Sequence, residues 1–194
     1  MTKNKLIKSV LQSKSIFSNK ETYFFLAPFG DILSGFFCEM TPRGAYVWKF
    51  VYPLFDISGQ LHLSYSSRLA YPEDFIDYKD VDKSKLAQEF LFRIVGHICD
   101  AYQRKSLSGF LQLCESRSGL LNNEVIQASY GCALILDSQN ELGLKYLEKA
   151  IPYLPEGYRA SCLKVIHGLQ GVPNAQQAIY ELKADNLLRL KIKY

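Results

Sequence analysis

The sequence predicts an α+β fold: one N-terminal helix, a four-stranded antiparallel meander, then an all-helical C-terminal half of about six helices. Three observations predict it. Apolar residues recur at helical spacing near the N-terminus, short apolar segments alternate with turns over residues 22–69, and helical spacing then continues to the C-terminus. We expect a helix-plus-meander region at 1–80 and a helical region at 81–194, packed together as one unit.

The opening helix is predicted over Thr2–Phe17, where lysines separate the apolar residues Leu6, Ile7, Val10 and Leu11. Four apolar segments follow and are predicted as strands: 23–27, 32–40, 45–54 and 61–69. Each link between them contains glycine with aspartate or proline, which is typical of tight turns. Short links between successive strands imply an antiparallel meander.

Alternate residues of the third predicted strand are aromatic. They are Tyr46, Trp48, Phe50 and Tyr52. Because side chains alternate between the two faces of a strand, these rings share one face and form an aromatic wall.

Helical spacing predicts the C-terminal helices at 83–104, 106–117, 122–137, 140–153, 157–170 and 174–191. A small-then-apolar pattern recurs in them about every 35 residues, at Gly109, Gly143 and Ala178. Residues 124–157 resemble one tetratricopeptide repeat, which carries small and large residues at the spacing of Gly131, Leu134, Gly143, Leu147, Ala150 and Pro155. Gln127 departs from that pattern, where the repeat has an aromatic residue. Degenerate helix-hairpin repeats and an ordinary amphipathic helix pair both fit this spacing.

Composition indicates a folded protein of the reducing cytosol. The 194 residues are 48% hydrophobic, and no apolar run approaches the ~18 residues of a membrane helix. The basic N-terminus lacks the apolar core and cleavage site of a secretory signal. The five cysteines are odd in number and far apart, which favours buried thiols over disulfides.

No catalytic or cofactor motif is present. The three histidines form no zinc-ligand spacing, so we expect no metal. Phosphate-binding glycine loops and a nucleophile elbow are absent as well. Cys38 and Cys114 lack any sequence feature that would supply a base. We therefore expect neither a cofactor nor catalytic residues, although catalytic groups can converge from distant positions.

Two surfaces are candidates for partner binding. The first is an acidic–aromatic segment, in which carboxylates could steer a basic partner while rings supply contact area: Tyr71, Glu73, Asp74, Phe75, Asp77, Tyr78, Asp80 and Asp82. The second is the polar face of the fourth predicted strand, with His62 and Arg68. The alternatives are a solvated connector whose last acids cap the next helix, and a polar edge strand that resists aggregation.

Basic residues of the first helix and of the C-terminus raise nucleic acid as a partner. The lysines alternate with apolar positions as on any solvated helix face, and no aromatic residues lie among them. Nucleic-acid binding is thus the weaker interpretation.

The segment Tyr46–Phe55, followed by 61–65 and by Arg68-Leu69, resembles small bacterial proteins of the polymorphic-toxin immunity kind. The resemblance implies a cytosolic protein that binds and neutralises a cognate toxin, without cofactor or catalytic residues. Such inhibitors are typically acidic, whereas this chain has a net charge of +4; the segment 71–82 would supply a local negative field.

The leading hypothesis is accordingly a cytosolic immunity protein acting by occlusion on a partner with a basic surface. Two alternatives stay open. One is an enzyme or ligand-binding protein with a pocket between the aromatic sheet face and the helices. The other is a helical-repeat adaptor that binds through residues 83–191.

Overall fold

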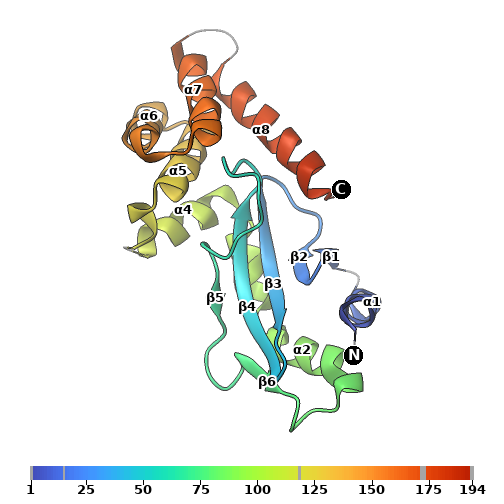
Figure 1. Ribbon diagram of the computed structural model, residues 1–194. Helices are drawn as coiled ribbons and strands as arrows, with labels where there is room; N and C mark the ends of the chain where they lie inside the picture. Colours follow the sequence, from blue (N-terminus) through green and yellow to red (C-terminus); the bar gives the residue numbers. More distant parts are fainter. Residues whose placement is uncertain (1, 15, 118, 171–173, 193–194) are drawn as a thin grey trace. The chain divides into compact units, whose positions relative to one another are not determined.

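The computed structural model describes residues 2–14, 16–117, 119–170 and 174–192. It confirms the predicted α+β class, since a helix, an antiparallel sheet and a run of helices follow one another along the chain (Figure 1). The chain divides into two compact units. Unit 1 comprises residues 1–51 and 66–105, and unit 2 comprises residues 52–65 and 106–193.

In the described part of unit 1 the sheet has six strands in place of the predicted four. The strands are β1 (Phe17–Lys20), β2 (Tyr23–Leu26), β3 (Ile32–Met40), β4 (Gly44–Pro53), β5 (Ser67–Arg68) and β6 (Phe75–Asp77). Their order is β1-β2-β3-β4-β5, and β6 also pairs with β4. Both β5 and β6 run antiparallel to β4, with Arg68 opposite Trp48 and Phe75 opposite Tyr46. The last two residues of β4 belong to unit 2.

Three segments differ from the prediction. The first helix, α1 (Lys3–Ser13), ends early, and the following residues form β1, which pairs with β2 across a turn where Glu21 has a φ of 55°. The acidic segment contains the strand β6. Of the predicted strand 61–69 only β5 is a strand, because residues 61–65 belong to unit 2 and bond there through His62 and Tyr65.

Helices cover one face of the sheet in unit 1. The helices are α1, α2 (Leu86–Ile94) and α3 (Ile98–Arg104). Their apolar side chains and those of inward-facing strand residues form one buried core. The helices contribute Leu6, Val10, Phe90 and Ile94, and the strands contribute Phe24, Leu26, Phe36, Ala45, Val47 and Ile76. Each fully buried Leu, Val, Ile or Phe side chain among them contributes about 1.5–3 kcal/mol. Because Ala45 and Val47 face this core, Tyr46 and Trp48 point to the opposite face, where both are half-buried.

Within the described residues, unit 2 contains five further α-helices. They are α4 (Leu107–Ser116), α5 (Glu124–Leu136), α6 (Asn140–Ala150), α7 (Glu156–Gln170) and α8 (Ala175–Leu190). The predicted boundaries are confirmed to within a few residues. Side chains cap three helix starts: Ser106 accepts from the Gly109 amide, Asn123 from Val125 and Ile126, and Asn174 from Gln177. The predicted helix 83–104 is divided by a 3₁₀ turn at Val95–His97.

Helices α5 and α6 cross closely at two glycines. A Cβ atom on Gly143 would lie 2.7 Å from the carbonyl oxygen of Gly131, and one on Gly131 would lie 2.9 Å from that of Gly143. Only hydrogen fits between the two backbones, so larger residues would push the helices apart. The three positions of the recurring pattern fall near the starts of α4, α6 and α8. Whether these helices form a true repeat array stays a prediction.

Gly143→Ala is expected to lower the free energy of unfolding by about 1–3 kcal/mol, since the new methyl group meets backbone and Ile135. The matched control is Gly157→Ala in α7, where a Cβ would meet no heavy atom within 4 Å. That control should leave stability unchanged or raise it by up to about 1 kcal/mol. Urea unfolding followed by circular dichroism measures both, and equal stability of the two variants would contradict close packing at this crossing.

Candidate functional site

The predicted acidic segment separates into residues with local structural roles and residues that face solvent. Glu73 bonds to His97, with 2.7 Å between Oε2 and Nε2. Asp77 accepts from the Lys79 amide at 2.9 Å, which closes a turn after β6. Asp82 caps the following 3₁₀ turn by accepting from the Ser84 amide at 2.8 Å. Hydrogen bonds from the backbone and side chain of Ser84 hold the pKa of Asp82 below its ordinary value.

An acidic groove of about 470 Å³ lies at the end of this segment. It is lined by Asp80, Val81, Asp82, Lys85, Gln88, Glu89 and Phe92. Phe92 is 74% exposed, which is unusual for so large an apolar side chain, and Asp80 is exposed as well. Glu89 is held in place by Arg93, at 2.8 Å. The groove therefore combines an apolar surface with carboxylates, but only Asp80 and Asp82 come from the predicted set.

The structure brings two other predicted residues together on the outward face of the sheet. Arg68 and Phe75 come from β5 and β6, which both pair with β4. The Arg68 guanidinium carbon lies 3.8 Å from the Tyr46 ring centroid and 5.0 Å from that of Trp48, and Phe75 lies 4.7 Å from Tyr46 between centroids. We call Tyr46, Trp48, Arg68 and Phe75 the aromatic–arginine cluster. The sequence suggested each part separately, and the strand register joins them.

The remaining predicted residues of the segment differ in exposure. Tyr71 is 91% exposed, whereas Asp74 and Tyr78 are half-buried. The Tyr78 hydroxyl is buried without a hydrogen-bond partner, and burial raises its pKa. Tyr71 is thus available to a partner, while Tyr78 packs against the core of unit 1.

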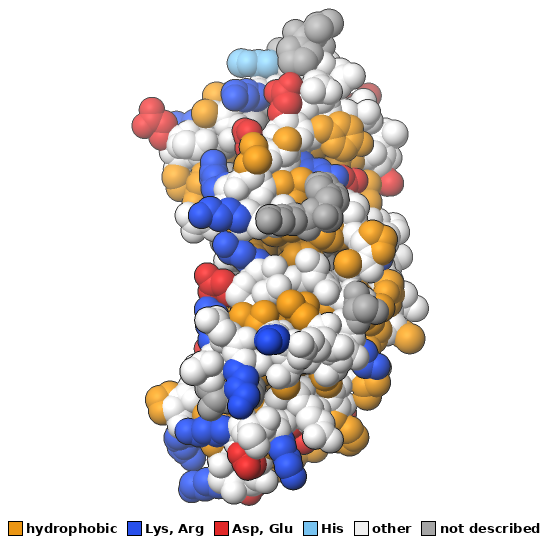
Figure 2. Space-filling view, turned by 90° about the vertical axis from the view of Figure 1, so that its right-hand side faces the viewer, with side chains coloured by type: hydrophobic (Ala, Val, Ile, Leu, Met, Phe, Trp, Pro, Cys, Tyr) orange, Lys and Arg blue, Asp and Glu red, His pale blue; other side chains and the backbone are white. Residues whose placement is uncertain are grey.

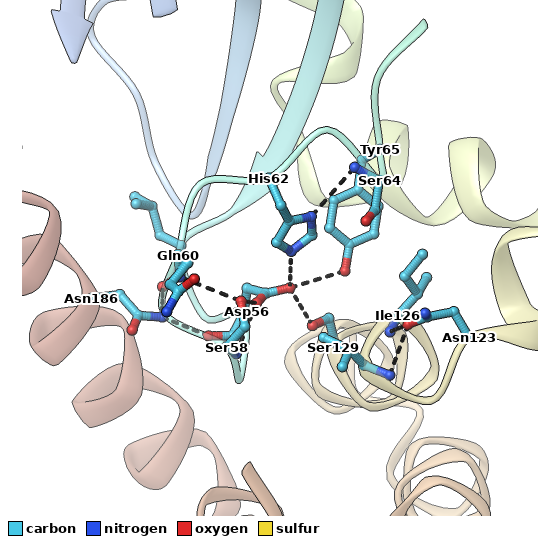
Figure 3. A network of polar contacts seen from close by, with 12 residues as sticks. Asp56, Ser58, Gln60, His62, Ser64, Tyr65, Asn123, Ile126, Ser129 and Asn186 are labelled. Carbon is cyan, nitrogen blue, oxygen red and sulfur yellow. Dashed lines mark hydrogen bonds and ion pairs between the residues drawn. The ribbon is translucent and has the colours of Figure 1, made fainter. Parts of the chain in front are cut away.

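His62 was predicted to share a strand face with Arg68, and this was wrong. His62 lies in unit 2 and its Nε2 atom is 3.4 Å from Oδ2 of the fully buried Asp56 (Figure 3). The physical reason is that a buried carboxylate needs donors, and the loop folds to supply them.

Asp56 is the most heavily bonded buried polar group of unit 2 among the described residues. Its Oδ1 accepts from the amide and the hydroxyl of Ser58. Its Oδ2 accepts from the Ser129 hydroxyl at 2.9 Å and the Tyr65 hydroxyl at 3.1 Å, besides His62 (Figure 3). Ser129 lies on α5, so the carboxylate ties the loop to that helix. Burial alone would raise the pKa of Asp56, but the bonds from His62 and Ser58 outweigh it and lower the pKa.

A side chain of helix α8 binds the backbone of the same loop. The Asn186 amide donates to the carbonyls of Leu54 and Asp56, at 2.8 and 2.7 Å. Gly59 has a φ of 61°, and a Cβ there would lie 2.4 Å from an Arg189 guanidinium nitrogen. Glycine is therefore required at this turn by both conformation and space.

The Asp56 network is arranged as an anchor for the loop. In a nucleophilic triad a hydroxyl bonds to the histidine, whereas here the hydroxyls of Ser58, Tyr65 and Ser129 donate to the carboxylate. The other ring nitrogen of His62, Nδ1, accepts from the Ser64 amide at 3.4 Å. The sequence indicated only a turn at 56–59, because Ser129 and Asn186 are remote along the chain.

The cysteines are all free, and Cys99 alone is exposed. Burial raises the pKa of Cys38 and of Cys114 to about 12. Both thiols therefore stay protonated near neutral pH, as expected for packed rather than reactive cysteines.

Within the described parts of the chain, no group of three or more His, Cys, Asp or Glu residues could hold a metal ion. No helix in those parts is both long and apolar enough to cross a membrane.

Basic side chains occur at several separate places over the lower half of the face in Figure 2. Lys3, Lys5 and Lys8 of α1 are exposed, and Lys3 pairs with Glu21 at 2.6 Å.

Comparison with protein-family models, with curated proteins and with solved structures gives no significant match to this chain.

Asp56→Asn is expected to lower the free energy of unfolding by about 3 kcal/mol or more at pH 7, because the amide cannot accept all five bonds. The folded-state pKa of Asp56 is lowered, so its contribution is complete above the unfolded pKa of about 3.9 and is lost as pH falls toward the folded pKa. The stability gap between wild type and variant should therefore narrow below about pH 4. Urea unfolding across this pH range tests it, with the exposed Asp185→Asn as control. A gap that is constant with pH would contradict an ionised Asp56.

Proposed function

We propose that this chain is a cytosolic protein-binding module that neutralises a cognate bacterial toxin by direct binding and occlusion. The observation that carries the proposal is the acidic groove of unit 1, which Asp80, Asp82 and Glu89 line together with the exposed side chain of Phe92. Carboxylates beside an exposed aromatic ring combine long-range attraction for a basic partner with contact area for holding it.

The groove suits a basic side chain or turn of a protein. Its volume of about 470 Å³ is large enough to receive such a group. The carboxylates would pair with the cation while Phe92 covers its aliphatic stem or stacks on a guanidinium. Tyr71, also on unit 1 and 91% exposed, adds a second ring for a partner to bury.

Overall charge does not oppose this proposal. The chain is basic by +4, but steering depends on the local field, which falls off within about 10 Å at ordinary ionic strength. Three carboxylates and one lysine line the groove, and its local charge stays negative when Arg93, which pairs with Glu89, is counted as well.

The alternative of a helical-repeat adaptor is favoured by a different groove. It lies on unit 2, has a volume of about 570 Å³ and is lined by Asn122, Glu124, Gln127, Lys149 and Tyr153. Tyr153 is 73% exposed there. The other alternative, an enzyme or ligand-binding protein, needs a pocket between the aromatic sheet face and the helices. In unit 1 the core helices pack against the opposite face of the sheet, so the structure does not favour this alternative.

Neutralisation itself is tested by co-expression with the product of the adjacent gene. We expect that product to arrest growth when expressed alone, growth to resume when this chain is present, and the two proteins to copurify at micromolar concentration. If no protein is retained at that concentration, or if copurification leaves the arrest unrelieved, the proposal is wrong.

The site is tested by combining Asp80→Asn, Asp82→Asn and Glu89→Gln. Asparagine keeps the cap that Asp82 provides and glutamine can still accept from Arg93, so the fold should be retained. We expect the dissociation constant of the complex to rise about tenfold or more at low salt, and the effect to shrink as salt is added.

The matched control neutralises three exposed acids of unit 2, by Glu141→Gln, Glu148→Gln and Asp185→Asn. It changes net charge by the same amount and should leave affinity nearly unchanged. Equal effects of the two triple variants would show that net charge matters and the groove does not. If Tyr153→Ala weakens the complex instead, the adaptor alternative is favoured.

A further inference from the structure

The aromatic–arginine cluster contains a cation without an anionic partner. Arg68 is exposed and its guanidinium contacts the rings of Tyr46 and Trp48. Among the described residues, no carboxylate lies within ion-pair distance of it. The acid beside Trp48 is Glu39, which accepts from the indole nitrogen at 2.9 Å. The two rings therefore hold the Arg68 guanidinium in place, but no carboxylate of the described residues neutralises its charge.

This arginine is also held in place before any partner arrives. Its backbone pairs with Trp48 in the sheet, and its side chain lies across two rings. Stacking uses the flat face of a guanidinium, so the N–H donors at its edge stay available for a bidentate contact with a carboxylate. A side chain that is already ordered loses less entropy on binding than a free one.

We infer that Tyr46, Trp48 and Arg68 form a second docking surface, which takes an aspartate or glutamate side chain of a protein partner. Arg68 supplies the paired charge and the two half-buried rings supply apolar area around it. Trp, Tyr and Arg are the residues most enriched where protein interfaces derive their binding energy. This inference goes beyond the acidic groove, because it needs the opposite charge on the partner and does not depend on that groove.

The surroundings favour a single carboxylate over a polyanion such as nucleic acid. Glu39 lies beside the cluster through its bond to Trp48 and would repel a chain of phosphates. The nearest lysine along β4, Lys49, is paired with Asp100 of α3 at 3.1 Å. A single unpaired cation can pair with one carboxylate, whereas a chain of phosphates needs several unpaired cations.

Trp48 is the only tryptophan of the chain, so intrinsic fluorescence reports directly on this surface. The probe is an acetylated and amidated peptide of alternating valine and glutamate, compared with the same peptide carrying glutamine. We expect a saturable change in Trp48 emission with the glutamate peptide, at a dissociation constant of about 1 mM or tighter. The glutamine peptide should produce no saturable change.

Arg68→Gln should weaken binding of the glutamate peptide about tenfold or more, and Arg68→Lys should have an intermediate effect because it keeps charge but loses the fork. The control is Lys83→Gln, which removes another cation stacked on a ring of unit 1, 5.0 Å from the Tyr78 centroid. Titration calorimetry measures the affinity of each variant for the peptide, and circular dichroism checks that each variant is folded.

Three outcomes would overturn the inference: equal binding of the two peptides, unchanged affinity of Arg68→Gln, or a response to inorganic phosphate as strong as that to the glutamate peptide. Because the acidic-groove variants keep Arg68, they should bind the glutamate peptide normally. Failure of this inference is thus distinguishable from failure of the proposed function.

Discussion

The burial of the Asp56 carboxylate is the constraint on which unit 2 depends. A buried charge without partners costs several kcal/mol, so it is compatible with folding only where donors surround it. Here the donors come from the loop itself and from Ser129 on α5, while Asn186 on α8 holds the adjacent carbonyls. The ionised group thereby joins a non-helical segment to α5, and Asn186 joins the backbone of the same segment to α8.

In unit 1 the one-sided covering of the sheet has the main functional consequence. Helices α1, α2 and α3 bury the side that carries Ala45 and Val47, and alternation then places Tyr46 and Trp48 on the other side. Large rings left partly exposed next to an arginine and near short edge strands form a surface suited to protein contact. The acidic groove belongs to the same unit but uses a different part of it, the start of α2.

The acidic segment shows why composition alone does not define a binding site. Its carboxylates have different tasks: Asp77 completes a turn, Glu73 pairs with a histidine, Asp82 both caps a turn and lines the groove, and Asp80 lines the groove. A carboxylate that already accepts backbone amides has fewer free acceptor sites for a partner. The groove also includes Glu89 and Phe92 from α2, for which the sequence predicts only a place in a helix.

The sequence by itself determined the α+β class, the strands β2 to β4 and the C-terminal helices, because periodicity and turn residues are local signals. Tertiary structure decided the rest. The strands β1 and β6 exist through pairing with β2 and β4, His62 and Arg68 separate because the loop 61–65 bonds to Asp56, and the aromatic–arginine cluster depends on register. Each of these depends on partners far along the chain, and long-range pairing leaves no local pattern from which to read it.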